Sequence, residues 1–196
     1  MKMLNFKLLL PMTAAIVLIS NCSKDSSKTA SPFIGNYVFS QAKTAAAINI
    51  PVIVPNVGST TITIPVATDI TPAIEAALLG AITCTSPPTY LELRSNNSIY
   101  YSCAGSNAVN AGTWNEVSAT ELILNLNSTA VPSSPSGIQL TITNIVTDAS
   151  SITGVTTVPL PKAMIAFSLP EGVTLDTTAP DFFVVTFSIK FTKVAK

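Results

Sequence analysis

Apolar and polar residues alternate over several stretches of this chain, and the alternation predicts β-strands. The pattern is clearest at residues 90–94, 122–126, 138–143 and 185–192. Successive side chains of a strand point to opposite faces, so each stretch has one apolar and one polar face. Sheets that bury a single face are typical of antiparallel barrels and sandwiches. We therefore expect an all-β fold, an antiparallel barrel or sandwich whose strands are separated by Ser-, Asn- and Pro-rich turns.

The apolar positions of these strands would point into such a barrel. A small barrel is either filled by its own side chains or holds one small ligand, and this lining would suit an apolar one. The inward set that the alternation predicts is Leu91, Leu93, Leu122, Leu124, Ile138, Leu140, Ile142, Val185, Phe187 and Ile189.

Two proline-rich stretches depart from the regular pattern. Residues 48–67 hold two β-rich runs around Asn56, Val57 and Gly58, which predicts an inserted hairpin. Its prolines cannot all donate to a ladder, so we expect the hairpin at a sheet edge or projecting from the body. Residues 158–180 predict an irregular excursion before the last strand.

One short helix is expected after the hairpin. Thr71 can cap it, Pro72 suits its first position, Glu75 favours its N-terminal dipole, and Gly80 can end it. Ile74 would then lie on the face that packs against the sheet.

The first 21 residues are typical of a secretory signal. Lys2 and Lys7 precede an uncharged apolar stretch at 8–19, which is short for a membrane span and contains Pro11. Residues 22–32 are polar and without periodicity after the cysteine, which predicts a flexible tether. The domain itself would occupy residues 33–196.

The sequence Leu18-Ile19-Ser20-Asn21-Cys22 resembles the lipobox of bacterial lipoproteins, with Asn21 in place of the usual small residue. The resemblance implies cleavage before Cys22 and acylation of its sulfur, and more than one acyl chain gives a stable membrane anchor. It also implies a place at the bacterial outer membrane, on the periplasmic face or at the cell surface. The alternative is a secreted protein cut near Ser20, with a free Cys22 thiol.

Charge and composition argue against several functions. The chain has ten basic and ten acidic residues and no basic cluster, so we expect no nucleic-acid partner. It has no histidine, which excludes Ser-His-Asp and Cys-His catalysis and the commonest transition-metal ligand. The acids are scattered and no phosphate-binding glycine motif occurs. We therefore expect no enzyme, no cofactor and no metal.

Cys84 and Cys103 are the two cysteines left if Cys22 is acylated, and an exported protein tends to oxidise such a pair. The residues near them predict a hairpin of strands at 89–94 and 98–103, with Cys103 at its outer end. We therefore predict a disulfide, which would stabilise the fold by about 3 kcal/mol. A redox-active or metal-binding pair is the alternative, but the CxxC spacing is absent.

From residue 33 onward the chain resembles the lipocalin-like domains of bacterial envelope lipoproteins. The similar pieces are the stretch around Tyr37, the short helix, the strands at 90–93 and 99–103, and Gly112-Thr113-Trp114. The resemblance implies a lipocalin-like barrel, with Tyr37 and Trp114 packed at its closed end.

The sequence thus leads to two functional hypotheses. One is a lipid-anchored module whose barrel binds a small apolar ligand or has a structural role. The other is a surface-exposed β-sandwich interaction protein, such as an adhesin or an accessory of glycan uptake, with the 48–67 hairpin as its partner-binding edge. An internal void would favour the first, and a filled core would favour the second.

Overall fold

The protein folds as a closed antiparallel β-barrel with a small sheet at one end. The computed structural model describes residues 30–79, 89–103, 106–127, 137–166 and 169–195, so Cys22 and Cys84 lie outside it. Barrel neighbours follow the order β1-β11-β9-β8-β7-β6-β5-β4, closed by the pairing of β4 with β1. The barrel strands are β1 (Gly35–Thr44), β4 (Thr89–Leu93), β5 (Ser98–Cys103), β6 (Val109–Ser118), β7 (Glu121–Leu126), β8 (Ile138–Thr147), β9 (Ser151–Pro161) and β11 (Phe182–Val194).

This architecture confirms the predicted all-β antiparallel barrel and overturns the sandwich of the second hypothesis. Along β11, buried residues alternate with exposed or half-buried ones from Phe183 to Phe191, as a strand with one face in the core requires. A closed sheet leaves no edge to pair with another chain, so the barrel wall itself is protected.

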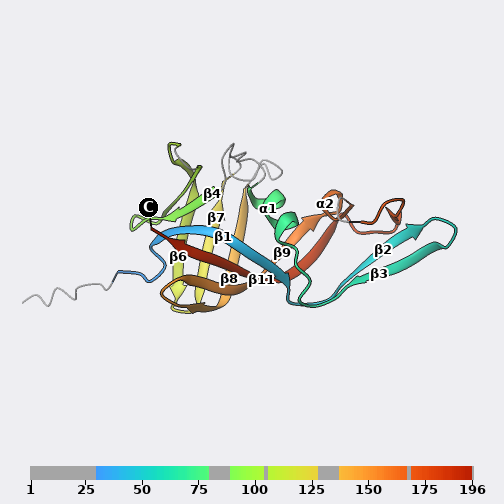
Figure 1. Cartoon of the computed structure of the whole chain (residues 1–196), viewed down its shortest axis with the longest axis horizontal. Coiled ribbons are helices and arrows are strands. Elements are labelled where there is room, and N and C mark those ends of the chain that lie inside the picture. The colour runs from blue at the N-terminus through green and yellow to red at the C-terminus, as the bar shows by residue number, and fades with distance from the viewer. Residues whose placement is uncertain (1–29, 80–88, 104–105, 128–136, 167–168, 196) are drawn as a thin grey trace, which may run out of the picture.

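The hairpin expected at 48–67 is present and projects from one end of the barrel (Figure 1). Its strands are β2 (Ile48–Val54) and β3 (Gly58–Ile64), and we call residues 48–64 the arm. Asn56 takes the left-handed conformation in the connecting loop, with a φ of 63°, which Asn tolerates better than most residues. Strand β10 (Thr174–Leu175) pairs with β2, which gives a three-stranded sheet of order β10-β2-β3.

The irregular excursion expected at 158–180 is only partly irregular. Its first residues complete β9, a short helix α2 (Lys162–Ala166) follows, and β10 joins the arm. Pro159 and Pro161 fit into β9 because the strand there pairs with β11, whereas its pairing with β8 stops at Thr156. Proline has no N–H to donate, so it is tolerated at a strand position where no neighbouring strand accepts that hydrogen bond.

Helix α1 (Thr71–Leu79) lies where it was expected, but its first residue acts differently from the prediction. The Thr71 hydroxyl accepts a hydrogen bond from the Ala42 amide of β1 at 2.9 Å instead of capping its own helix. The Asp69 carboxylate accepts the Thr71 amide at 2.9 Å. Ile74 is fully buried, so the helix is fixed to the barrel at both its start and its inner face.

The end of the barrel away from the arm is held by Trp114. Its indole N–H donates to the Arg94 carbonyl at 3.0 Å, and its amide donates to the Asn97 carbonyl at 2.8 Å. Both acceptors belong to the β4–β5 turn, so the tryptophan fixes that turn to β6. Tyr37 is also buried, and its hydroxyl donates to the Phe33 carbonyl at 2.9 Å.

Gly112 in β6 should be irreplaceable. Its φ is 141°, and a Cβ built there would lie 1.9 Å from the Asn125 carbonyl oxygen of β7. We expect Gly112→Ala to lower the free energy of unfolding by about 2 kcal/mol or more, measured by urea denaturation with circular dichroism.

Gly58→Ala is the matched control for that substitution. Gly58 also has a positive φ, of 91°, but no atom lies within 4 Å of the added Cβ. Backbone strain alone should then cost about 1 kcal/mol. Equal losses for the two variants would show that the contact with β7 does not matter.

Candidate functional site

The predicted barrel lining lies in the core, apart from Ile138, which is half-buried. The space left inside the barrel is small. Its volume is about 20 Å³, which is room for one water molecule. Pockets that hold drug-sized ligands are typically about 300–1,000 Å³. Within the part of the chain that the structure describes, the barrel interior is thus filled by its own side chains.

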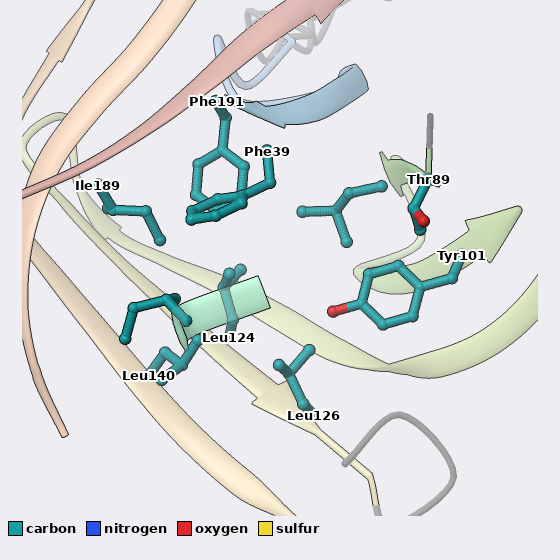
Figure 2. Close-up of a pocket in the computed structure, with 10 residues that line it drawn as sticks. Phe39, Thr89, Tyr101, Leu124, Leu126, Leu140, Ile189 and Phe191 are labelled. Carbon is teal, nitrogen blue, oxygen red and sulfur yellow. The ribbon is translucent and has the colours of Figure 1, made fainter. Parts of the chain in front are cut away.

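Several residues that fill the interior were missed by sequence reasoning. Figure 2 shows Phe39 and Phe191 side by side above the leucines, and their ring centroids are 5.8 Å apart. Phe191 continues the alternation of Ile189 and could have been found, whereas Ile74, which reaches the barrel from α1, lies on the helix face that was expected to pack against the sheet. Burial raises the pKa of the Tyr101 phenol. The residues around this space are Phe39, Ile74, Thr89, Leu91, Tyr101, Leu124, Leu126, Leu140, Ile189 and Phe191.

Strand β3 of the arm is largely exposed. Residues 58–61 and Thr63 of β3 are exposed, and β3 is an edge strand of its sheet within the described residues. The sequence has no charged residue between Lys43 and Asp69. The β2–β3 register also runs without a bulge from the Ile48–Ile64 pair to the Val54–Gly58 pair. The arm therefore lacks three devices by which proteins commonly protect edge strands: charge, interior proline on the edge strand, and bulges.

The other side of the arm is fixed to the segment before β11. Ile50 and Val52 of β2 are buried, 1% and 0% exposed, and Val52 pairs with Leu175 of β10. The Asp176 amide donates to the Pro51 carbonyl at 3.0 Å, and the Ser59 hydroxyl donates to the Asp176 carboxylate. The arm is therefore a supported element with one free edge.

Asp176 has an unusual pKa for an exposed carboxyl group. The hydroxyl of Ser59 and then the amide and hydroxyl of Thr178 donate to its carboxylate, and these hydrogen bonds lower its pKa to about 2. Because the charged form accepts these bonds, protonation weakens the link between β3 and the 176–178 turn.

The cysteines are only partly covered by the described residues. Cys103 ends β5, opposite Thr89 at the start of β4. Cys84 lies outside the described residues, so the Cys84–Cys103 disulfide stays a prediction, as does acylation of Cys22.

The arm and the start of the described chain lie at opposite ends of the molecule (Figure 1). Within the described residues, no helix is long and apolar enough to span a membrane. The described part of the chain also gathers no group of three or more Cys, Asp or Glu side chains suited to hold a metal ion. No family model, curated protein or solved structure matches this chain.

Acid should loosen the arm before it unfolds the barrel. A carboxyl group with a lowered folded-state pKa stabilises the fold at pH values above its ordinary pKa, and this contribution is lost as pH falls through the folded value. For Asp176 that window runs from about pH 4 to about pH 2. Hydrogen exchange, corrected for the intrinsic rate, should show protection of the arm amides falling in this window.

Asp176→Asn should lower the protection of the arm at pH values above about 4 and remove most of this dependence. Asp148→Asn is the control, because hydrogen bonds from Ser150 and Ser151 also lower the pKa of Asp148 to about 2, but in the β8–β9 turn. Arm protection that stays constant down to pH 2 in the unmodified protein would contradict the role given to Asp176.

Proposed function

We propose that this protein is a lipid-anchored interaction module of the bacterial envelope, whose filled barrel supports an arm that a partner protein extends by strand addition. The observation that carries the proposal is the contrast between the two parts. The interior space is about 20 Å³, whereas β3 offers an exposed and uncharged edge.

The filled interior argues against the apolar ligand expected there from the sequence. A ligand would have to displace core side chains such as Phe39, Leu124 and Phe191, which surround the space. Displacing packed side chains by even small groups typically costs about 1–3 kcal/mol. The barrel is better suited to a structural role, as a rigid base for the arm.

The edge of β3 favours an extended segment of another protein as the partner. An edge strand presents unpaired N–H and C=O groups, which an added strand can satisfy along its whole length. The exposed side chains of β3 are mainly Ser and Thr, which form favourable cross-strand pairs and repel neither charge sign. Such an edge accepts a strand through its backbone and leaves side-chain selection weak.

The lipid on Cys22 would hold the module at the membrane. The predicted Cys84–Cys103 disulfide would link the segment before β4 to the end of β5. A tether of ten polar residues spans roughly 15–20 Å between its ends. Because the described chain begins at the end opposite the arm, an anchor that precedes it would let the arm extend away from the membrane (Figure 1). We assign no catalytic step to this module.

Strand addition can be tested with a photo-crosslinking amino acid in place of Thr63, in cells that express the full chain. We expect a discrete crosslinked product whose yield falls at least about fivefold when Thr61→Lys is added. Lysine on an edge strand is one of the devices by which proteins discourage pairing with another strand, and a fivefold loss corresponds to about 1 kcal/mol.

Thr147→Lys is the matched control, because Thr147 is also exposed on a strand but belongs to the closed barrel. It should leave the yield unchanged. Equal effects of the two lysines, or no product at all, would count against strand addition. A product of twice the chain mass would identify the partner as a second copy.

The anchor can be tested by metabolic labelling with an alkyne fatty acid. The unmodified protein should take up the label, and Cys22→Ser should abolish it, because the sulfur of Cys22 is the proposed acylation site. Cys103→Ser should keep the label. Label that persists in Cys22→Ser, or is absent from the unmodified protein, would disprove this part of the proposal.

A further inference from the structure

The residues of β3 that point their backbone polar groups to the free edge can be identified from the neighbouring strands. The Pro51 carbonyl of β2 accepts a hydrogen bond from the Asp176 amide, so this carbonyl points toward β10 and away from β3. Thr61 lies directly opposite Pro51 in the antiparallel β2–β3 ladder, so the two form a pair without hydrogen bonds to each other. The N–H and C=O groups of Thr61 therefore point to the free edge. Those of Ser59 and Thr63 do so too, because the direction alternates along a strand.

The chain limits this edge at both ends, at equal distances from Thr61. Strand β3 runs from Gly58, directly after the loop of the arm, to Ile64, so Thr61 is its central residue. The next residue, Pro65, has no N–H to donate, and Ala67 beyond it has a positive φ, of 66°. An added strand uses the whole edge only when it is centred on Thr61. A strand centred elsewhere lies against the loop at one end or against Pro65 at the other.

A second copy of β3, placed antiparallel on a two-fold axis at Thr61, matches this edge residue by residue. The two Thr61 residues then lie opposite each other, and Ser59 lies opposite Thr63 of the second copy. These edge-facing residues exchange both of their backbone hydrogen bonds. Thr60 lies opposite Ile62 in the pairs between them. Between residues 59 and 63 only Ser, Thr and Ile side chains meet, and no like charges are brought together.

The same register brings together two exposed valines that lie beyond opposite ends of β3. Val57 in the loop is 72% exposed, and Val66 at the base of the arm is 57% exposed. In the antiparallel pair, Val57 comes opposite Pro65 of the second copy and next to its Val66, and the two-fold axis makes this contact twice. Burying apolar surface at both ends of the contact favours it. A foreign strand would need an apolar residue at each end to do the same.

We propose that the strand added to β3 comes from a second copy of this chain, which gives a two-fold symmetric sheet of order β10-β2-β3-β3-β2-β10. The proposal rests on the strand addition proposed above and names its partner. Each copy covers the unprotected edge of the other, so the assembly is closed and leaves no free β3 edge. Because the arm projects from one end of the barrel, antiparallel arms place the two barrels at opposite ends of the joint sheet (Figure 1).

The test places one cysteine on the proposed axis, as Thr61→Cys in the full chain. Isolated envelopes of cells that express it are oxidised mildly and analysed by gel electrophoresis without reductant. The Cα atoms of a hydrogen-bonded antiparallel pair are about 5.5 Å apart, and disulfides form at about 4.4–6.8 Å. We expect a disulfide-linked product of twice the chain mass that the unmodified protein does not give. Its absence from Thr61→Cys would overturn the proposal.

Thr63→Cys is the matched control, because Thr63 is exposed on the same strand but lies about 13 Å along it from its own copy in this register. Its dimer yield should be several-fold lower than that of Thr61→Cys. Co-expression of Ser59→Cys with Thr63→Cys should restore the dimer, because these two residues lie opposite each other. Equal yields from Thr61→Cys and Thr63→Cys would indicate random collision and overturn the proposal.

The contact between the two valines is tested in the Thr61→Cys chain. Adding Val57→Asp should lower the dimer yield about fivefold, which corresponds to about 1 kcal/mol, and adding Val66→Lys as well should restore it through opposite charges. Val146→Asp is the control, because Val146 is 66% exposed but lies on the barrel strand β8. It should leave the yield unchanged. Equal losses for Val57→Asp and Val146→Asp would contradict the register.

These results separate the second copy from strand addition itself. A photo-crosslinked product from position 63 that contains another protein, with no disulfide in Thr61→Cys, would keep strand addition and overturn the second copy as partner. Absence of both products would overturn both proposals.

Discussion

The fold depends on the pairing of β11 with two neighbours at once. Its residues pair with β9 from Phe182 to Thr192 and with β1 from Phe187 to Val194, and the second ladder closes the barrel. Without it β1 and β11 would both be open edges, and the alternating apolar faces of eight strands would have no enclosed core. The filled interior follows from closure, since a barrel of eight strands is just wide enough for its side chains to meet.

Closure also explains why two distant insertions meet. The arm follows the end of β1, and the segment with α2 and β10 runs from the end of β9 to the start of β11. Because β1, β11 and β9 are adjacent and antiparallel, these three strand ends lie at the same end of the barrel. The insertions therefore pack against each other, joined through Pro51 and Asp176, although more than a hundred residues separate them in sequence. A crevice lined by Ile48, Leu160 and Val185 remains between them and the barrel.

The sequence predicted what depends on local patterns and missed what depends on contacts between distant segments. Alternation predicted β4, β7, β8 and β11 and their inward residues, and the turn residues around Asn56 predicted the arm. The continuation of β9 through Pro159 and Pro161 was missed, because proline argues against a strand unless the position of its neighbours is known. The contributions of Phe39 and Tyr101 to the interior depend on how distant strands are arranged, which local periodicity does not show.

The position of Trp114, hydrogen-bonded to the β4–β5 turn, has a practical consequence for optical spectroscopy. It is the single tryptophan of the chain, and the four tyrosines, at positions 37, 90, 100 and 101, also belong to barrel strands. The tryptophan and tyrosine signals in fluorescence and near-ultraviolet circular dichroism thus report on the barrel and do not detect changes in the arm. A single cooperative unfolding transition measured by these signals would describe the barrel alone. The arm could unfold earlier without changing them.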